Sequence, residues 1–365
     1  GTGVMLTGSH NPSNYNGLKI MINGETLSEN SIQILKQRID TNDFITGNGS
    51  CHTTAVHHAY TTNIHKDIKL ERPFKVVVDC GNGVAGVIAP HLIETLGCKV
   101  IKLFCEVDGN FPNHHPDPSV PNNLEDLIST VKNENADLGL AFDGDGDRLG
   151  VVDAAGRIIW PDRQMILYAN DLLQRQPGAE IIYDVKCSRH LADSIEKQGG
   201  KATMWKTGHS LIKSKMKDTG ALLAGEMSGH IFFKERWYGF DDAIYTAARL
   251  LEILAKDKRS PTKVFATLPN AVNTPELKIE LEKFGEHYEL MQKVQDSFKF
   301  DEAKITTIDG IRADFNDGWG LVRPSNTTPC LVIRFEANDQ ATLEMIQSQF
   351  RRQFLAIDNR LKLPF

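Results

Sequence analysis

The chain has 365 residues, which at about 150 residues per domain predicts two to four domains with ample buried core. Lysine and arginine number 41 against 47 aspartates and glutamates, and this net charge of −6 argues against a nucleic-acid-binding surface. Hydrophobic residues make up 41%, which excludes a disordered chain, and no apolar run approaches the roughly 18 residues of a membrane span. The cysteines are scattered without a C-x-x-C pair, so we expect no disulfide framework, no zinc site and a cytoplasmic location.

The first residues run directly into a strand-like segment, Val4-Met5-Leu6, with no initiator methionine, basic region or apolar signal core before it. We therefore expect further chain upstream. In an α/β domain this strand would be a central one with apolar residues on both faces, and without upstream neighbours its apolar side chains would be exposed and residues 1–55 mobile.

From residue 75 the chain alternates between strand and helix patterns, which predicts open α/β sheets. Strands are expected at 75–79, 99–104, 137–142, 181–185, 202–205 and 221–225, and helices at 84–96, 124–131, 164–173, 191–197, 209–216 and 243–255.

After about residue 270 the pattern changes to short strands joined by Asp-Gly turns, which indicates an antiparallel meander. The strands are expected at 276–281, 305–308, 311–315, 321–322 and 331–335, with a last helix over 343–355. This predicts a small α+β domain at the end of the chain. The proline-bearing segments 71–73 and 260–261 are typical of joints.

Four loops carry side chains suited to chemistry. The first, Leu6-Thr7-Gly8-Ser9-His10-Asn11-Pro12, presents a hydroxyl beside an imidazole at the end of a strand. Glycine permits a close approach of the backbone to a ligand, so Ser9 could be a nucleophile or phosphate carrier. A turn serine that bonds its own backbone is the alternative.

The second loop, Asp143-Gly144-Asp145-Gly146-Asp147-Arg148, follows an apolar strand. Three carboxylates at alternate positions repel one another unless a cation neutralises them, and oxygen ligands suit Mg²⁺. An EF-hand is excluded, since Arg148 stands where that loop needs glycine and Ala154 where it needs glutamate. A solvated acidic turn is the alternative.

The third loop, Gly225-Glu226-Met227-Ser228-Gly229-His230, sets a carboxylate and a hydroxyl two residues apart, where both could grip vicinal sugar hydroxyls. A capping or turn role is an equal alternative.

The fourth loop, Arg323-Pro324-Ser325-Asn326-Thr327-Thr328-Pro329, combines hydroxyls, backbone N–H groups and one guanidinium, which together could form a phosphate site. A polar hairpin connection is the alternative.

A competing motif, Gly81-Asn82-Gly83-Val84-Ala85-Gly86, matches the dinucleotide-binding fingerprint G-x-G-x-x-G and has Glu106 beyond the next strand. It would make the protein an NAD-dependent dehydrogenase. That interpretation leaves the other loops unexplained, and tight strand-to-helix turns need glycine for geometry alone.

In this order, TGSHNP, DGDGDR, GEMSGH and RPSNTTP resemble the loops of the α-D-phosphohexomutase superfamily, and the chain is most similar to its bacterial bifunctional phosphomannomutase/phosphoglucomutase branch. The resemblance implies three consecutive α/β domains with mixed sheets followed by a C-terminal α+β domain, around one central cleft. It implies boundaries at 1–55, 56–157, 158–269 and 270–365, with one loop in each domain. The family has about another hundred residues before the serine loop, so the first domain is expected to be incomplete at its N-terminus.

The resemblance also implies the role of each residue. Ser9 corresponds to the phosphoserine, and the metal ligands are Ser9, Asp143, Asp145 and Asp147. The phosphoryl group is surrounded by His10, Lys19 and Arg148. The sugar hydroxyls are read by Glu226 and Ser228, and the substrate side is lined by Lys186, His209 and His230. The phosphate that does not react is held by Arg323, Ser325, Asn326 and Thr327. Met227 in place of glutamine favours the mannose/glucose type.

The implied reaction interconverts hexose 1-phosphate and hexose 6-phosphate, for mannose and glucose, through a 1,6-bisphosphate. The cofactors would be Mg²⁺ and glucose 1,6-bisphosphate or mannose 1,6-bisphosphate. The partners would be sugar phosphates, without nucleic acid or membrane, and the protein a monomer. The general base is left open among Lys19, His10 and His209. A non-catalytic sugar-phosphate-binding protein remains the second alternative, although it would not need Ser9 or three aspartates.

Overall fold

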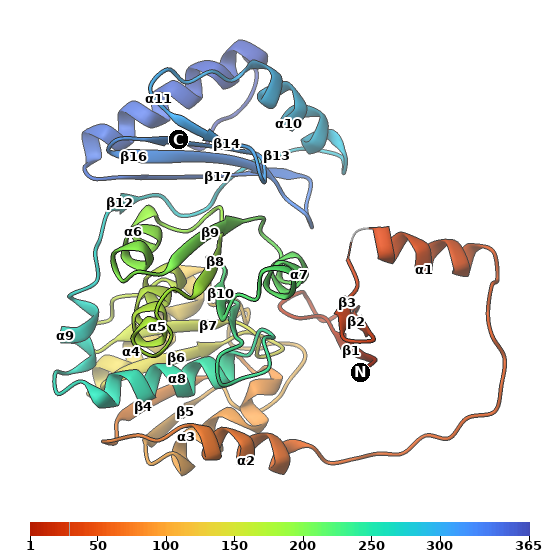
Figure 1. Cartoon of the computed structure of the whole chain (residues 1–365), viewed down its shortest axis with the longest axis vertical. Helices are drawn as coiled ribbons and strands as arrows, with labels where there is room; N and C mark the ends of the chain where they lie inside the picture. The colour runs from red at the N-terminus through yellow and green to blue at the C-terminus, as the bar shows by residue number, and fades with distance from the viewer. Residues whose placement is uncertain (29) are drawn as a thin grey trace. The chain divides into compact units, whose positions relative to one another are not determined.

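The computed structural model describes residues 1–28 and 30–365, and the chain divides into two compact units. The first unit contains residues 1–182, 191–203 and 208–268, and the second contains residues 183–190, 204–207 and 269–365. Figure 1 labels the helices and strands. In the described part of the chain, no helix is both long and apolar enough to span a membrane.

The chain begins with a three-stranded antiparallel sheet made of β1 (Gly3–Thr7), β2 (Gly17–Ile22) and β3 (Glu25–Thr26), in that order. Strand β1 is the edge strand of the described sheet, and its expected central position in a longer domain stays a prediction. The expected exposure is present, since Val4 and Leu6 are 61% and 70% exposed. Two helices without a sequence prediction follow, α1 (Asn30–Asp40) and α2 (His57–Asp67).

The second sheet has the order β5-β4-β6-β7, formed by β4 (Lys75–Asp79), β5 (Lys99–Leu103), β6 (Leu138–Phe142) and β7 (Leu149–Asp153). Strand β4 is parallel to both neighbours, whereas β6 and β7 are antiparallel, so the sheet is mixed, as predicted. Strand β7 has no sequence prediction. Because β7 pairs with β6, the predicted acidic loop, residues 143–148, is the connection of a hairpin. The short helices η2 (Pro121–Leu124) and α4 (Glu125–Asn133) precede β6.

The helix predicted over 84–96 is broken. The chain instead forms a 3₁₀ turn, η1 (Val84–Val87), and then α3 (Ala89–Thr95). Pro90 explains the break, because proline lacks the N–H of a continuous helix and is tolerated only in a first turn. Here it occupies the first turn of α3.

A third sheet has the order β11-β10-β8-β9, from β8 (Glu180–Asp184), β9 (Lys201–Trp205), β10 (Leu223–Gly225) and β11 (Ile231–Phe233). Strands β10 and β11 form an antiparallel hairpin that holds the third loop. The helices of this region are α5 (Pro161–Arg175), α6 (Arg189–Lys197), α7 (His209–Thr219), α8 (Ala243–Lys256) and the short α9 (Pro261–Phe265), where a joint was expected.

The second unit contains the predicted antiparallel meander, in the order β12-β17-β16-β15-β14, with β13 also paired to β17. Helices α10 and α11 cover one face of the sheet (Figure 1), and their apolar side chains, including Val294, Ile346 and Phe350, form its core. Helix α10 has no sequence prediction. The elements are β12 (Val272–Asn273), β13 (Leu277–Glu280), α10 (Glu286–Ser297), β14 (Lys304–Thr306), β15 (Ile311–Phe315), β16 (Gly318–Pro324), β17 (Cys330–Ala337) and α11 (Gln340–Ile357).

Candidate active site

The turn after β1 places Ser9 in a conformation that few serines adopt. Its φ is +51°, in the left-handed region, where a side chain crowds its own backbone. The turn is held by the Ser9 N–H, which donates to Thr7 Oγ1 at 2.7 Å, and by the Thr7 hydroxyl, which donates to Asp145 Oδ2 at 2.9 Å. The strained turn therefore ties the serine to the acidic loop.

The hydroxyl of Ser9 lies among groups that suit phosphoryl chemistry. Ser9 Oγ is 3.1 Å from His10 Nδ1, 3.2 Å from Asp145 Oδ1 and 3.4 Å from Asp143 Oδ2. These partners come from two loops more than 130 residues apart in the sequence. The first and second predicted loops thus form one site.

Glycine at position 144 permits this close approach. A Cβ on Gly144 would lie 2.1 Å from the backbone oxygen of Ser9, a distance that no side chain can occupy. On the other side, the Gly144 carbonyl accepts from Val84 N at 3.0 Å. The alternation of aspartate with glycine therefore has a steric reason as well as an electrostatic one.

The acidic loop concentrates negative charge. Carboxylate oxygens of Asp143, Asp145 and Asp147 all lie within 4.8 Å of one another. Lys19 Nζ bridges Asp145 Oδ2 at 2.9 Å and Asp147 Oδ2 at 2.5 Å, and Arg148 Nε lies 3.0 Å from Asp143 Oδ2. Such a group of oxygen atoms can hold a divalent cation, and the ammonium of Lys19 already shows that it attracts positive charge.

The carboxyl groups of the acidic loop have divergent pKa values. Burial, together with the neighbouring Asp147, raises the pKa of Asp143 to about 7. Burial also acts against ionisation of Asp145, but the Lys19 ammonium outweighs it and lowers that pKa to about 2. A bound dication would favour the charged form of both carboxyl groups, because opposite charge lowers a carboxyl pKa.

The third loop is anchored to the β6–β7 hairpin, which carries the acidic loop. Leu149 N donates to Gly229 O at 3.2 Å, and Arg148 and His230 form an isolated bridge. Glu226 is 1% exposed and accepts from Gly208 N at 2.5 Å, while Ser228 is half-buried in the same turn. The predicted sugar-reading residues therefore belong to the unit that holds Ser9 and the acidic loop.

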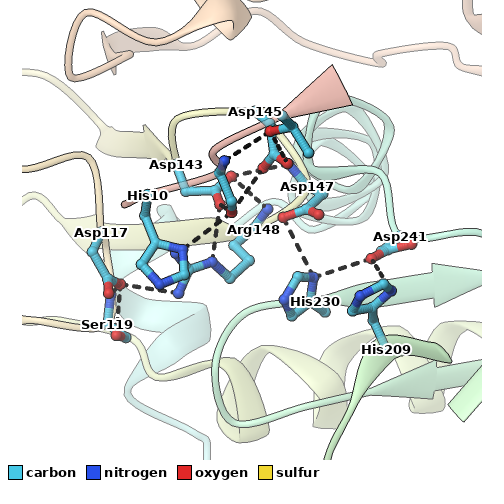
Figure 2. Close-up of polar contacts among 12 residues, drawn as sticks. His10, Asp117, Ser119, Asp143, Asp145, Asp147, Arg148, His209, His230 and Asp241 are labelled. Carbon is cyan, nitrogen blue, oxygen red and sulfur yellow. Dashed lines mark hydrogen bonds and ion pairs between the residues drawn. The ribbon is translucent and has the colours of Figure 1, made fainter. Parts of the chain in front are cut away.

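His209 and His230 stack with ring centroids 5.8 Å apart (Figure 2). Burial opposes protonation of His230, but Asp147 and Asp241 outweigh it and raise its pKa to about 9. Burial lowers the pKa of His209 to about 4, although Asp241 acts against this. Sequence reasoning missed Asp241, which no motif contains.

The three candidates for the general base differ in charge. Burial and the Arg148 charge lower the pKa of His10 to about 4, so its imidazole is neutral near pH 7, like that of His209. Burial opposes the charge of Lys19, but Asp147 and Asp145 raise its pKa above the ordinary value. Lys19 is therefore a bound cation that cannot accept a proton.

Asp117, also missed from sequence, lies 3.1 Å from Arg148 Nη1.

The remaining predicted residues belong to the second unit. Arg323 is 4% exposed, and its Nε lies 2.8 Å from Asp309 Oδ2. Within the described residues its Nη2 is buried without a hydrogen-bond partner. Ser325 Oγ accepts from the N–H groups of Thr327 and Thr328 at 3.3 and 3.2 Å, and Asn326 Nδ2 donates to Thr207 O at 3.3 Å. The loop is thus a folded polar turn with an unused guanidinium donor.

Lys186 in the second unit is 5% exposed. Its Nζ lies 2.7 Å from Glu276 Oε1 and 3.7 Å from Asp184 Oδ2. Burial opposes its charge, but Glu276 and Asp184 raise the pKa of the ammonium above its ordinary value. Glu276 was missed from sequence.

The glycine-rich turn over residues 81–86 is filled by protein contacts. A Cβ on Gly83 would lie 2.8 Å from Gly144 O, and one on Gly86 would lie 2.1 Å from Cys105 O. These glycines let the turn pack against the acidic loop and the end of β5. The dinucleotide interpretation is not supported.

Known protein families match the chain in four consecutive segments. Residues 1–46, 56–156 and 160–272 match phosphoglucomutase/phosphomannomutase alpha/beta/alpha domains I, II and III, and residues 274–353 match the C-terminal domain of the same family.

Individual relatives are similar over nearly the whole chain. A phosphomannomutase/phosphoglucomutase from Pseudomonas putida is 59% identical over 364 residues, which cover 100% of this chain and 78% of the relative. A phosphoglucomutase from Neisseria gonorrhoeae is 53% identical over 96% of this chain and 77% of the relative.

Solved structures have the same fold. A phosphoglucomutase/phosphomannomutase family protein from Burkholderia thailandensis superposes with a TM-score of 0.95 at 53% identity, covering 100% of this chain and 78% of that one. An N-acetylphosphoglucosamine mutase from Aspergillus fumigatus, in complex with GlcNAc-6P and magnesium, has a TM-score of 0.65 at 17% identity over 99% of this chain and 89% of that one. The latter similarity is one of fold alone.

Proposed function

Since the chain belongs to the phosphoglucomutase/phosphomannomutase family and has the four-domain phosphohexomutase fold, we propose that it interconverts the 1- and 6-phosphates of glucose and mannose. The sugar assignment is supported by the relatives, since the Pseudomonas putida protein is named for both sugars and the Neisseria gonorrhoeae protein for glucose. Met227 in the third loop, in place of glutamine, agrees with it. We propose domain boundaries at 1–55, 56–157, 158–269 and 270–365.

The observation that carries the proposal is the position of Ser9 Oγ. It lies within 3.4 Å of two aspartates of the acidic loop and within 3.1 Å of His10 Nδ1. A non-catalytic binding protein has no use for a strained serine aimed at carboxylates. A phosphoryl carrier fits this arrangement, because a cation held by the carboxylates would stabilise the negative charge on the transferring phosphoryl group.

The residues of the acidic loop fit a hard divalent cation. The fit rests on three clustered carboxylates and on Asp147 Oδ1, which is buried without a hydrogen-bond partner among the described residues. We propose that Asp143, Asp145, Asp147 and an oxygen of phosphorylated Ser9 would hold Mg²⁺. When bound, this ion would supply electrostatic stabilisation of the charge on the transferring phosphoryl group.

In the first half of the reaction, the bond between phosphorus and Ser9 Oγ breaks. A new bond forms between phosphorus and the oxygen of the free sugar hydroxyl, and the hydroxyl proton passes to a base. The product is a 1,6-bisphosphate. Arg148 would hold the phosphoryl oxygens through Nη2, which is buried without a partner in the described chain. Lys19 would add a second positive charge beside them.

In the second half, the bisphosphate turns end for end and Ser9 Oγ attacks the other phosphorus. The bond between that phosphorus and the sugar oxygen breaks, and the sugar oxygen takes up a proton to become the free hydroxyl. The serine proton would pass to His10 Nδ1, which is neutral near pH 7 and lies 3.1 Å from Ser9 Oγ. The neutral His209 would accept the proton of the sugar hydroxyl in the first half of the reaction. Lys19 is excluded as the base in both halves of the reaction, because Asp145 and Asp147 keep its ammonium protonated.

Glu226 and Ser228 would bind sugar hydroxyls that are common to both orientations of the bisphosphate, and Lys186 and His230 would add contacts on the substrate side. The phosphate that does not react would bind to the loop of Arg323, Ser325, Asn326 and Thr327. The buried, unpartnered Nη2 of Arg323 supports this, because an anion would satisfy the donor. We further propose that glucose 1,6-bisphosphate or mannose 1,6-bisphosphate activates the enzyme, and that it is a cytoplasmic monomer.

The first test is phosphorylation of the protein itself. Glucose 1,6-bisphosphate with Mg²⁺ should add one phosphoryl group to Ser9, measured as intact mass and located by peptide mapping. Ser9→Ala should accept none, whereas the exposed Ser13→Ala should be labelled like wild type. Absence of label in wild type, or label that persists in Ser9→Ala, would exclude the phosphoserine mechanism.

The second test is turnover. Glucose 1-phosphate and mannose 1-phosphate should each be converted to the 6-phosphate in a coupled assay that contains Mg²⁺ and a trace of the bisphosphate. Phosphorylation at Ser9 without conversion of either sugar would mean that the reaction is correctly assigned but the substrate is not.

A further inference from the structure

The imidazoles of His209 and His230 and the carboxylates of Asp147 and Asp241 lie close together. Asp147 also belongs to the acidic loop. His230 Nδ1 lies 3.4 Å from Asp147 Oδ1 and 3.2 Å from Asp241 Oδ2. His209 Nδ1 lies 3.8 Å from the same Asp241 oxygen. Figure 2 shows the side chains of His209 and His230 directed toward Asp241, and Asp147 directed toward His230.

Each carboxylate is oriented through its other oxygen. Lys19 Nζ lies 2.5 Å from Asp147 Oδ2, and Lys213 Nζ lies 3.0 Å from Asp241 Oδ1. Both aspartates therefore turn their remaining oxygen toward the imidazoles. This is the outer-shell support that a preorganised metal site requires.

Three atoms of this group have no hydrogen-bond partner within the described residues although they are buried: Asp147 Oδ1, His209 Nδ1 and His230 Nδ1. Asp147 is only 8% exposed. A buried polar atom without a hydrogen bond is unfavourable, so a cation that binds several such atoms at once is favoured.

The spacing of three of these residues suits a metal ion, because Asp147, His230 and Asp241 each offer a ligand atom within 4.8 Å of the other two. Bonds of about 2.0 to 2.1 Å to nitrogen and oxygen place tetrahedral ligands roughly 3.3 Å apart. His230 Nδ1 lies 3.4 Å from Asp147 Oδ1 and 3.2 Å from Asp241 Oδ2, and His209 Nδ1 lies 3.8 Å from Asp241 Oδ2. Imidazole ligands disfavour Mg²⁺ and Ca²⁺ and favour Zn²⁺ or Co²⁺.

We propose that His230, Asp241 and Asp147 form a second divalent-cation site, selective for Zn²⁺ and similar transition ions, and that the neighbouring His209 turns toward the ion as its fourth ligand. It does not depend on mutase activity. Its occupation would remove both imidazoles from the substrate side and share Asp147 with the acidic loop. Micromolar zinc would therefore inhibit the enzyme without displacing Mg²⁺.

The test uses Co²⁺, whose visible absorption is intense in a four-coordinate site and weak in an octahedral one. We would titrate wild-type protein with Co²⁺ in a large excess of Mg²⁺, which occupies the acidic loop. We expect one equivalent of tetrahedral Co²⁺, which Zn²⁺ bleaches. His230→Gln and His209→Gln should each weaken binding by at least about 100-fold, because loss of a ligand exceeds the 10- to 100-fold effect of losing an outer-shell partner.

His52→Gln, at an exposed histidine outside the group, is the matched control and should leave the Co²⁺ spectrum unchanged. His209 is 27% exposed at its side chain, so its replacement should leave the fold intact, as circular dichroism would verify. A weak octahedral spectrum that Mg²⁺ abolishes would mean binding at the acidic loop only and would overturn the proposal. A tetrahedral spectrum that persists in both histidine variants would overturn it as well.

Discussion

Ser9 combines a positive φ with a hydroxyl held against two carboxylates. We expect Ser9→Ala to lower kcat by at least about 1,000-fold, because the residue carries the phosphoryl group, whereas binding of glucose 1-phosphate changes little. Coupled kinetics and isothermal titration measure the two effects. Ser13→Ala should behave like wild type, and a Ser9→Ala enzyme that retains full kcat would refute the assignment.

Asp145 belongs to the acidic loop and also binds Lys19 and Thr7. Asp145→Asn should weaken Mg²⁺ binding by at least about 100-fold, more than the loss of an outer-shell partner would. It should also lower kcat more than it raises KM, because the ion acts on the transferring group. Activity measured against Mg²⁺ concentration distinguishes the two effects. Asp301→Asn, at an exposed aspartate, is the control. An effect confined to KM would mean that the Asp145 carboxylate does not act on the transferring phosphoryl group.

Glu226 is buried and accepts a hydrogen bond from Gly208 N. Glu226→Gln keeps the shape of the side chain but removes the charge that strengthens hydrogen bonds to sugar hydroxyls. We expect KM for both sugar phosphates to rise about 10-fold or more, since a hydrogen bond to a charged group contributes about 1.5 to 3 kcal/mol. Glu282→Gln, at an exposed position, should leave KM unchanged. A normal KM in Glu226→Gln would mean that other residues read the sugar.

At the scale of elements, the site depends on contact between the turn after β1 and the hairpin of β6 and β7. Gly144→Ala would place a methyl group 2.1 Å from Ser9 O, so the two loops must separate. We expect kcat and Mg²⁺ affinity to fall together, without unfolding of β6 and β7. Gly109→Ala, where a Cβ meets nothing within 4 Å, is the matched control. Wild-type kinetics in Gly144→Ala would show that the loops do not need this contact.

At the scale of the whole molecule, buried histidines make stability depend on pH. The pKa of His209 is lowered to about 4 from 6.5, so the unfolded chain binds more protons between these pH values and protonation destabilises the fold. His209 thus opposes folding progressively as pH falls from 6.5 to 4, by up to about 3 kcal/mol. The raised pKa of His230 has the opposite sign: its contribution is full below pH 6.5 and is lost as pH rises toward 9.

We therefore expect the melting temperature of His209→Gln, relative to wild type, to increase as pH is lowered from 7 to 4.5. Thermal scans in EDTA measure this difference and avoid metal effects. His52→Gln should follow wild type at every pH. A difference that stays constant with pH would mean that His209 does not titrate as described.

The sequence by itself determined most of the strands and helices after residue 75. Strand β4 and strand β15 occur at their predicted positions, because short apolar runs bounded by turn residues define a buried strand locally. It also predicted the four loops, since glycine, proline and clustered carboxylates are local signals. Strand β7, strand β11 and helix α10 were missed. Strands β7 and β11 return directly after β6 and β10 as antiparallel hairpins, whereas the apolar side chains of α10 pack in the core of the C-terminal sheet.

Only the tertiary structure decided how the first three of these loops meet. Asp117, Asp241 and Glu276 stand in no motif, and they become partners of Arg148, His230 and Lys186 only in the folded chain. The charge of Lys19 and the neutrality of His10 likewise depend on burial and on neighbours more than 100 residues away. Short-range patterns specify which chemistry is present, whereas the protonation states that let it operate arise from long-range packing in a medium of low polarity.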